Sequence, residues 1–462
     1  MHQKPLLRSN LILIGCGPHY QKKYHSILEQ YGVKIALLID LQANQDAINL
    51  FFQNKALKPH RTLFLEEYYR NAITPQDIQA FVRKQVNISS IDGVIISTEP
   101  KARKAYAIWA VKQKLSIFMD KPVSAFSDLT GMGKLLDDYE EIAQAASQGQ
   151  VDVVVSCERR AHPGYSWIKE YLRNFMDEIK VPITGIDIHF AGGVWLLPSE
   201  YATIENHPFK HGYGIILHSG YHYVDLLATF LSLNESLFNL HDIKYLLQVM
   251  ASRPADLGSL AKYDYLPLSN SEETFNIDFN QLNHLGETDV IIIGQAQKNS
   301  AVMTNFSLKM FGTSLSIRKA VKRSPCQNLE GRIRQEHVIL HLGHLCSIHI
   351  ISNPLKKLDP LGYPVEDFTI TVMNNPLLQS RKPIMIFSRK DISQIFPEIS
   401  ETASLNSHSR KWQLSEFLQG RNGNSSLGSH RNTVKLLDIV YSHLKAQLLT
   451  QKEGEAGILQ PI

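Results

Sequence analysis

The stretch Leu11–Gly17, LILIGCG, decides the fold of the N-terminal part of this chain. A run of four apolar residues bounded by glycine is typical of a buried strand in a parallel sheet, because such strands are covered on both faces. Gly15 allows a sharp turn at the end of this strand, and His19–Gln30 is predicted to be the helix that follows. A strand, a glycine turn and a helix in this order are typical of a doubly wound α/β sheet that binds a phosphate group.

The same turn predicts a dinucleotide site. Gly17 lets the backbone approach a pyrophosphate without a Cβ in the way, and the helix beginning near Pro18 and His19 would direct amides to it. A second apolar run ends at Asp40, at the spacing where an acid accepts hydrogen bonds from the adenosine ribose. Tyr20 stands at the third glycine position, and a glycine pair also occurs in α/β folds that bind no nucleotide.

The residues after Asp40 favour NAD over NADP. No Arg or Lys follows Asp40 within several residues, so no cation is present to take a 2′-phosphate. NAD is therefore the expected cofactor, and NADP is the less favoured alternative.

Length and charge limit the other classes of partner. With 462 residues the chain is too long for one ordinary core, and two domains are expected. A hydrophobic content of 44% with 20% charged residues is that of a globular protein, and a net charge of +4 is too mild to indicate nucleic-acid binding. We therefore expect a small-molecule substrate and no nucleic acid.

Apolar runs and cysteines indicate the compartment. The apolar run before Gly15 is too short for a signal-peptide core, and no run approaches the length of a membrane span, so no membrane association is expected. The four cysteines, Cys16, Cys157, Cys326 and Cys346, are widely spaced and form no Cys-x-x-Cys pair. This spacing favours reduced thiols in the cytoplasm over a disulfide framework.

Strand and helix patterns alternate along the first third of the chain. Strands are predicted at Val33–Ile39, Ile91–Thr98, Leu115–Met119 and Val151–Val155, and helical stretches at Gln42–Asn54, Pro75–Gln85, Lys101–Gln113 and Ser127–Ser147. This alternation predicts a Rossmann domain over residues 1–157, with a doubly wound parallel sheet.

Beyond residue 160 the pattern changes to successive strands. After a predicted helix at Tyr165–Phe175, strands are expected at Ile183–Phe190, Asp289–Ala296, Val302–Met310, His337–His349 and Phe368–Val372. Residues 158–450 are therefore predicted to be an α+β substrate-binding, catalytic and oligomerisation domain with a large, mostly antiparallel sheet. Asp391–Gly428 looks like loop and short helix, Arg431–Leu449 like an amphipathic helix, and 451–462 like a flexible tail.

Several motifs in order resemble the glucose-fructose oxidoreductase, inositol dehydrogenase and MocA (Gfo/Idh/MocA) family. The motifs are the Gly15-Cys16-Gly17 turn, Ser97–Pro100, Phe118–Val123 with Asp120-Lys121-Pro122 in place of the family's Glu-Lys-Pro, Val155–Arg160 leading to Pro163–Tyr165, Gly212–Gly214 leading through His218 to Gly220–Leu227, and the closing segments Phe417–Arg421 and Val434–Ser442. The resemblance covers much of the chain. It implies an NAD(P)-dependent oxidoreductase acting on sugars, cyclitols or their derivatives, and a homo-oligomer that associates through an open sheet face.

The resemblance also assigns site residues. Lys121 and His222 would be the catalytic acid/base pair, because a buried lysine and a histidine can both exchange a proton near neutral pH. Substrate contacts would come from Arg160, Tyr165 and His218, and cofactor contacts from Gly15, Gly17, Pro18, His19, Asp40, Ser97, Thr98, Glu99, Asp120 and Lys121. His189, Trp195 and Lys210 are weaker candidates for neighbours of the site.

The chain departs from the family at His218, where Asp is common, and at Arg103, which is often His. A second imidazole changes the charge of the site, so either the substrate is acidic or the chemistry is altered. His218 and His222 are four residues apart, but the Glu of a zinc motif and a third ligand are missing, so no metal site is expected. Three further histidines, His337, His341 and His349, are expected on a polar sheet face or a subunit interface.

Other interpretations remain open at this stage. Lys121 by itself is compatible with a solvated lysine at a strand end, and His222 with a hydrogen-bonded core histidine. A redox-neutral glycosidase or lyase that recycles NAD, and a non-catalytic NAD-binding regulator, are the competing functions. Net formation of NADH would distinguish the oxidoreductase from both.

Overall fold

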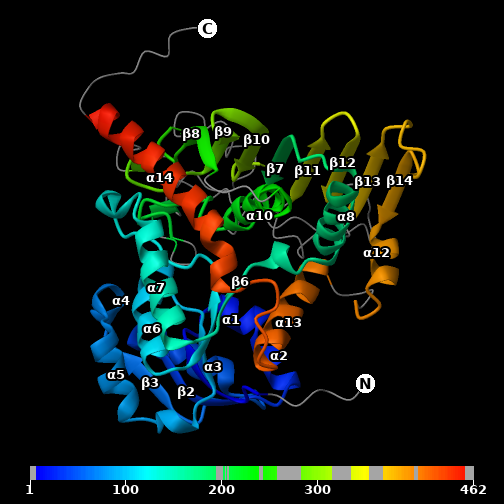
Figure 1. Cartoon of the computed structure of the whole chain (residues 1–462). Coiled ribbons are helices and arrows are strands. Elements are labelled where there is room, and N and C mark those ends of the chain that lie inside the picture. Colours follow the sequence, from blue (N-terminus) through cyan, green and yellow to red (C-terminus); the bar gives the residue numbers. More distant parts are fainter. Residues whose placement is uncertain are drawn as a thin grey trace, which may run out of the picture. The chain divides into compact units, whose positions relative to one another are not determined.

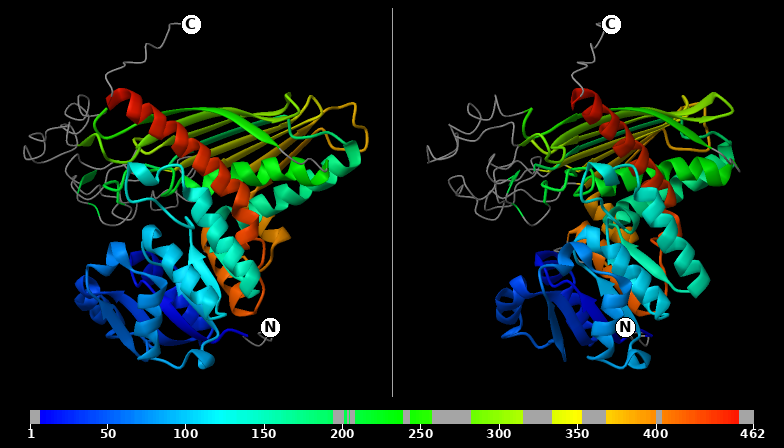
Figure 2. Two further views of the ribbon diagram at one scale, coloured as in Figure 1. Left: turned by 60° about the vertical axis from the view of Figure 1, so that its left-hand side comes forward. Right: turned by 90° about the vertical axis from the view of Figure 1, so that its left-hand side faces the viewer.

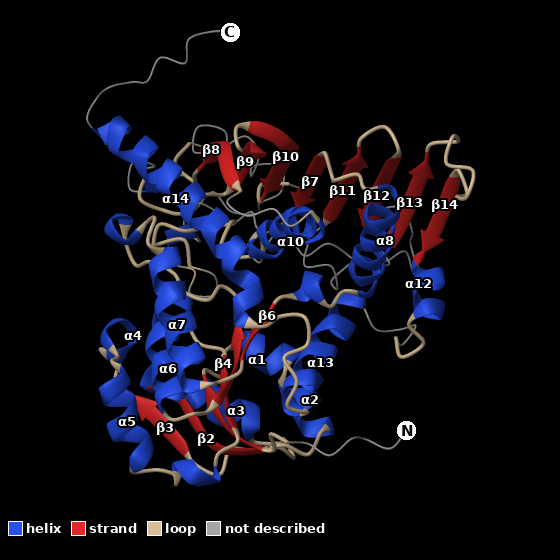
Figure 3. Ribbon diagram, in the orientation of Figure 1, coloured by secondary structure: helices blue, strands red, loops and turns tan. Residues whose placement is uncertain are grey.

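The computed structural model describes residues 7–193, 201–202, 204, 208–238, 243–256, 282–314, 334–352, 368–399 and 404–452. The chain forms two compact units, shown in Figures 1 and 3. The first unit comprises Met1–Ala125, Lys134–Tyr165 and Ala403–Val434, and the second Phe126–Gly133, Ser166–Thr402 and Lys435–Ile462. Trp195, Cys326 and the predicted tail beyond residue 452 lie outside the described residues.

The first unit contains a six-stranded sheet in the order β3-β2-β1-β4-β5-β6, and every neighbouring pair is parallel. The strands are β1 (Asn10–Ile14), β2 (Lys34–Leu41), β3 (Thr62–Leu65), β4 (Gly93–Ile96), β5 (Ser116–Asp120) and β6 (Val153–Ser156). The helices are α1 (Pro18–Lys23), α2 (His25–Gln30), α3 (Gln45–Phe52), α4 (Tyr69–Ala72), α5 (Pro75–Arg83), α6 (Pro100–Lys112), α7 (Leu135–Gly149) and α13 (Leu405–Leu418). This order confirms the predicted doubly wound sheet, with its switch point between β1 and β4.

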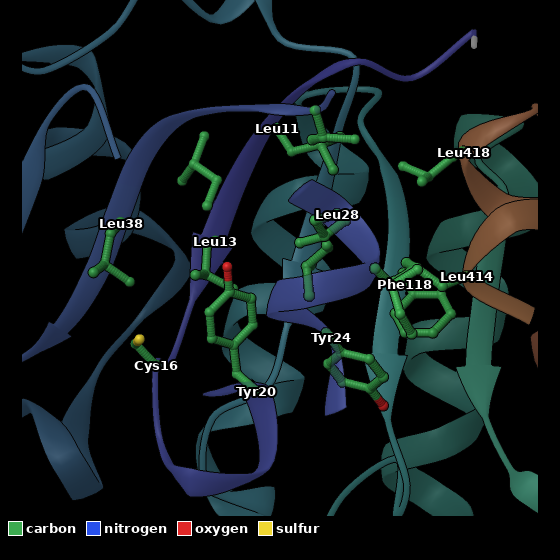
Figure 4. Close-up of a cluster of buried hydrophobic side chains, with 14 of the residues drawn as sticks. Leu11, Leu13, Cys16, Tyr20, Tyr24, Leu28, Leu38, Phe118, Leu414 and Leu418 are labelled. Atoms are coloured by element: carbon green, nitrogen blue, oxygen red, sulfur yellow. The ribbon is translucent and has the colours of Figure 1, made fainter. Parts of the chain in front are cut away.

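The helix predicted at His19–Gln30 is divided into α1 and α2 at Tyr24. Tyr20, which replaces the third glycine, is completely buried and lies in the same apolar cluster as Leu13 and Tyr24 (Figure 4). Its hydroxyl lies 3.2 Å from Nδ1 of His25. A tyrosine therefore fills the contact between helix and sheet where a glycine would allow a closer approach.

Helix α13 corrects two expectations from the sequence. Asp391–Gly428 was expected to be loop and short helix, but it contains this helix of 14 residues. Leu414 and Leu418 of α13 lie with Phe118 in the core of the first unit (Figure 4). Phe417 belongs to the same cluster, with its ring centroid 5.6 Å from that of Phe118. Burial of these side chains draws residues 403–434 into the first unit, whereas the predicted boundary placed all of 158–450 in the second domain.

The second unit contains an eight-stranded sheet in the order β14-β13-β12-β11-β7-β10-β9-β8. The strands are β7 (Gly185–Ala191), β8 (Lys244–Ser252), β9 (Asp289–Lys298), β10 (Ala301–Phe311), β11 (Gln335–Leu342), β12 (Cys346–Ser352), β13 (Phe368–Asn374) and β14 (Ile384–Ser388). Only the pair of β7 and β10 is parallel, which confirms a large, mostly antiparallel sheet. The single strand predicted at His337–His349 is a hairpin, because Gly343 turns the chain at a φ of +55°.

Helices cover one face of this sheet. They include α8 (Pro163–Ile179), α10 (Tyr221–Leu237), α12 (Arg389–Ile395) and α14 (Arg431–Lys452). Figure 2 shows α8 and α10 on the same side of the strands. On the strands of the sheet, buried residues alternate with partly or fully exposed ones, so the side chains of the opposite face project away from the core. No helix within the described ranges is long and apolar enough to cross a membrane.

Candidate functional site

The glycine turn brings the ends of β1 and β4 together. Gly15 has a φ of +85°, and a Cβ there would lie 2.7 Å from both the carbonyl oxygen of Ser97 and the amide nitrogen of Thr98. A Cβ at Gly17, in contrast, would meet no atom within 4 Å. Gly15 is therefore required by close packing, while Gly17 leaves open space above the turn, as the predicted approach of a pyrophosphate needs.

Asp40 lies near the end of β2 and braces the glycine turn. Its Oδ2 accepts a hydrogen bond from the amide of Cys16 at 2.6 Å, and its Oδ1 accepts hydrogen bonds from the amide of Leu41 and from Nδ2 of Asn44, both at 2.7 Å. A carboxylate has about four acceptor positions, so Asp40 retains capacity for a hydroxyl group. This partly exposed carboxylate beside the turn fits the ribose of a dinucleotide.

The beginning of α1 fits a pyrophosphate with one restriction. Pro18 has no N–H, so the amides that the first turn can direct to an anion are those of His19 and Tyr20. The glycine turn, Asp40 and these amides all lie at the carboxyl edge of the sheet, beside the switch point. The arrangement of these groups is compatible with the expected dinucleotide.

Asp120 ends β5 and is buried in a hydrogen-bonded network. Its Oδ2 accepts a hydrogen bond from Oγ of Ser97 at 2.6 Å, and its Oδ1 accepts one from the hydroxyl of Tyr24 and lies 3.5 Å from Nε2 of His19. Burial by itself would raise the pKa of Asp120, but His19, Arg103 and the two hydroxyl donors hold that pKa below its usual value. Asp120 is therefore a fixed negative charge next to Lys121.

Lys121 has an amine whose charge is disfavoured. Burial lowers the pKa of Lys121 to about 8, the nearby Arg103 lowers it as well, and the carboxylate of Glu158 opposes both. Burial also lowers the pKa of His19, which stands at the start of α1 near Asp120. An amine that titrates about one pH unit above neutrality can accept and return a proton under physiological conditions.

Arg103 fixes the backbone of this edge. Its Nε and Nη2 donate to the carbonyl of Thr98 at 3.0 and 2.8 Å, and its Nη1 donates to the carbonyls of Asp120 at 2.7 Å and Pro122 at 2.6 Å. The buried guanidinium thereby links the ends of β4 and β5 on both sides of Lys121. The sequence predicts no such role for Arg103, which stands where the family that the sequence resembles often has histidine.

Four further residues of this network were not predicted from the sequence. They are Tyr24, Ser156, Glu158 and Arg410. Tyr24 donates to Asp120 and lies 3.0 Å from Oγ of Ser156, which is also the register partner of Asp120 in the β5–β6 pair. Ser156 ends the strongly apolar strand β6 and Glu158 follows it, and polar residues at a strand end could have drawn attention to them.

Arg160 and Tyr165, the predicted substrate contacts, are held in the first unit. Arg160 donates to Oγ of Ser429 at 2.6 Å and to the carbonyl of Ser429 at 2.7 Å, and its own carbonyl accepts from Nδ2 of Asn424 at 2.5 Å. Tyr165 is completely buried, with its ring beside His162 and the guanidinium of Arg159. Arg160 therefore holds residues 424–429 in place beside the end of β6. The substrate role of both Arg160 and Tyr165 stays a prediction.

His218 and His222 lie in different local structures of the second unit. His218 belongs to the turn that precedes α10, is buried, and contacts the rings of Phe209 and Tyr213 with centroids 5.1 and 5.6 Å away. His222 is the second residue of α10 and is partly exposed. The two histidines thus do not share the face of one helix, and no group of three potential metal ligands occurs within the described ranges.

Glu287 clamps the turn that carries His218. Its carbonyl accepts from the amide of Ile215 at 2.8 Å, and its Oε1 accepts from the amide of Ile216 at 3.0 Å and from the hydroxyl of Tyr441 at 2.9 Å. Burial raises the pKa of Glu287. No sequence pattern predicts this role, because Glu287 ends an insertion, 253–287, that has no recognisable motif.

His189, one of the weaker candidates, lies on the face of the eight-stranded sheet opposite α10, the helix that carries His222. His189 projects from the outer face of β7, where it pairs with His337 of β11 at a ring-centroid distance of 5.8 Å. The neighbouring Phe190 is buried on the other face and stacks on Tyr223 of α10. His189 therefore lies across the sheet from α10, which corrects its expected place near the site.

Comparison with known proteins shows that the chain shares its fold with solved structures of other proteins. No family model and no curated protein sequence matches the chain. Among solved structures, the WlbA dehydrogenase from Bordetella pertussis in complex with NADH and UDP-GlcNAcA matches with a TM-score of 0.57 and 12% identity, over 95% of this chain and 96% of that one. Levoglucosan dehydrogenase in complex with NADH and levoglucosan matches with a TM-score of 0.56 and 12% identity, over 95% and 97%.

An oxidoreductase from Agrobacterium radiobacter, in complex with NAD+, L-tartaric acid and magnesium, matches with a TM-score of 0.55 and 13% identity, over 94% of this chain and 96% of that one. Each likeness covers nearly the whole of both chains. At identities this low, the likeness establishes that the fold is shared.

Proposed function

We propose that this protein is an NAD-dependent oxidoreductase that transfers a hydride between nicotinamide and a hydroxyl or carbonyl group of a sugar, a cyclitol or a sugar-derived compound. The observation that carries the proposal is Lys121, an amine with a pKa near 8 at the carboxyl edge of a doubly wound sheet. The open glycine turn and Asp40 at the same edge support a dinucleotide there. The similar solved structures named above contain NAD+ or NADH, and two of them contain a sugar or a sugar nucleotide.

NAD is the proposed cofactor, with NADP less favoured. Asp40 has two carboxylate oxygens beside the glycine turn, where they can accept hydrogen bonds from ribose hydroxyls. The same negative charge would repel the 2′-phosphate of NADP. We propose Gly15, Gly17, Pro18 and His19 for the pyrophosphate, and Ser97, Thr98, Glu99, Asp120 and Lys121 for the nicotinamide side of the cofactor.

The bound nicotinamide supplies the acceptor or donor of a hydride. Lys121 is proposed to hold and move the hydroxyl proton, since its lowered pKa makes the neutral amine accessible near pH 8. Asp120 and Arg103 fix the backbone and charge on either side of that amine. From the second unit, His222 is proposed as the other acid/base group.

Arg160, Tyr165 and His218 remain proposed contacts of the substrate. His218, in the position where a carboxylate is common in the family that the sequence resembles, would favour an acidic substrate when protonated.

We also propose a homo-oligomer that forms through the outer face of the eight-stranded sheet. Both edges of this face carry exposed apolar side chains, with Leu246 and Met250 of β8 exposed by 54% and 53% and Ile384 and Ile386 of β14 by 63% and 65%. Cross-strand pairing places each of these pairs on one face of the sheet. An apolar surface of this kind favours association. The cytoplasm is the proposed compartment, since Cys16, Cys157 and Cys346 are all free thiols.

The test is an absorbance assay for reduced nicotinamide with purified protein, NAD and pools of sugars, cyclitols and sugar acids. A signal that is lost in Lys121→Ala but kept in Lys112→Ala, which changes an exposed lysine of α6, would support the proposal. NAD binding is measured separately by fluorescence titration. Binding without any net signal, but with turnover of a glycoside, would favour the redox-neutral alternative, and absence of NAD binding would refute the proposal.

A further inference from the structure

Helix α13 returns from the C-terminal part of the chain to the end of β6. Oγ of Ser409 donates to the carbonyl of Glu158 at 2.5 Å, and Nε2 of Gln413 donates to the carbonyl of Cys157 at 2.6 Å. Both donors are almost completely buried. The two residues that follow β6 are therefore fixed by side chains from a segment about 250 positions later in the sequence.

The same helix places a cation against Glu158. Arg410 forms an ion pair with the carboxylate of Glu158, and its Nη2 lies 3.0 Å from Oγ of Ser407. The side chains of Arg410 and Glu158 are only 7% and 17% exposed. A pair so enclosed is screened little by water or salt, so its charges act on nearby groups with unusual strength.

Lys121 is a neighbouring group. β5 and β6 pair in parallel with Asp120 opposite Ser156, so the residues that follow them, Lys121 on one strand and Cys157 and Glu158 on the other, leave the sheet side by side. The carboxylate of Glu158 opposes the lowering of the Lys121 pKa, while Glu158 raises and Arg410 lowers the pKa of His19. Among the described residues, the charged and titratable groups near Lys121 include Glu158, Arg103, Cys157 and Asp120, and His19, whose pKa Lys121 lowers in turn.

We propose that Glu158 and Arg410 are positioning residues that together set the protonation state of Lys121. The carboxylate of Glu158 favours the protonated amine of Lys121, and the guanidinium of Arg410 weakens this influence by pairing with Glu158. Nothing in the motif at Asp120-Lys121-Pro122 predicts this pair, because Arg410 comes from a helix far away in the sequence. The catalytic consequence rests on the function proposed above, whereas the electrostatic effect on Lys121 does not.

The two members of the pair have opposite effects. Glu158→Gln keeps the shape of the side chain but removes the negative charge and leaves Arg410 uncompensated, so the titration of Lys121 should move to lower pH by ~1 unit, a tenfold change in the fraction of free amine. Arg410→Gln leaves Glu158 uncompensated and should move the titration to higher pH. The double variant should return close to the starting protein, and Arg410→Lys, which keeps the charge, should shift it least.

The experiment is competitive amine acetylation of the full-length protein without nucleotide, at a series of pH values. Mass spectrometry measures the labelling of the peptide containing Lys121 against the exposed Lys112 in the same sample. Opposite shifts in the two single variants, cancelled in the double variant, are expected. Equal, absent or same-direction shifts would overturn the proposal, because a purely structural disturbance would not shift the titration of Lys121 in opposite directions according to the charge that is removed.

Circular dichroism checks that each variant is folded. If Glu158→Gln does not fold, the comparison of Arg410→Gln with Arg410→Lys decides the question, since the former should shift the titration of Lys121 much more than the latter. The pH profile of kcat/KM should move in the same direction as the labelling. Correct labelling shifts in a protein without dehydrogenase activity would count against the proposed function only, and activity without labelling shifts would count against the charge pair only.

Discussion

Replacing Lys121 with methionine should stabilise the protein while removing its chemistry. The amine has a pKa of about 8 in the folded chain against 10.5 for an ordinary lysine. Each unit of pKa corresponds to about 1.4 kcal/mol, so keeping the proton on Lys121 lowers the free energy of unfolding by up to ~3.4 kcal/mol. Because the side chain is partly exposed, solvent screening reduces the expected gain to about 2 kcal/mol.

The pH dependence has a definite sign. A lysine with a lowered pKa in the folded state contributes its full stability above the unfolded pKa, and this stability is lost as the pH falls toward the folded pKa. The difference in stability between Lys121→Met and the starting protein should therefore be largest below about pH 8 and should shrink between pH 8 and 10.5. Methionine has a similar length and carries no charge, so it has no such dependence.

Urea unfolding followed by circular dichroism, at about pH 7 and about pH 10, measures this difference. Lys112→Met is the matched control, since Lys112 is exposed at the end of α6 and should show no comparable gain. Equal stabilities of Lys121→Met and the starting protein at the lower pH, or a difference that grows with pH, would refute the burial of a charged amine at this position.

Four further variants have expected outcomes. Gly15→Ala should lose about 1–3 kcal/mol of unfolding free energy in a thermal melt, because Gly15 has a φ of +85° and a Cβ there would meet backbone atoms at 2.7 Å. Gly17→Ala should keep the stability of the starting protein, because a Cβ there meets no atom within 4 Å, and should weaken NAD binding in a fluorescence titration. Tyr24→Phe should lose about 1–3 kcal/mol in urea unfolding near neutral pH, since it removes a donor to the buried Asp120, and an unchanged midpoint would contradict the network. His222→Asn should lower kcat by about 10²–10⁴-fold with an unchanged Kd for NAD, and an unchanged kcat would exclude it as an acid/base group.

Local pattern was sufficient for much of the first unit. The apolar runs ending at Gly15, Asp40 and Asp120 are buried on both faces of a parallel sheet, so each reads as a strand without reference to the rest of the chain. Polar residues at the carboxyl ends of such strands meet at one edge, which is why Asp40, Ser97 and Lys121 could be named together from the sequence. The hairpin within His337–His349 has a turn so short that the apolar pattern alone predicts one continuous strand.

Other features depended on contacts that no local pattern contains. Glu287 and Tyr441 come from distant parts of the chain and form a hydrogen bond at the turn that carries His218. Arg103 acquires its role only because its side chain donates four hydrogen bonds to three backbone carbonyls. In each case the side chain is polar and buried, and it is stable there because a distant partner satisfies it.

The sequence by itself determined the strand-turn-helix unit at the N-terminus, the doubly wound sheet and the alternation of inward and outward residues in the second sheet. These features follow from the spacing of apolar residues within short stretches of the chain. The tertiary structure alone decided that α13 belongs to the first unit and that Arg410 faces Glu158 beside Lys121. Helix α13 carries Ser409, Arg410 and Gln413 on buried positions, so hydrophobic periodicity could not find it. Those side chains are buried because carbonyl and carboxylate oxygens about 250 residues away accept their hydrogen bonds, and only folding brings the two segments together.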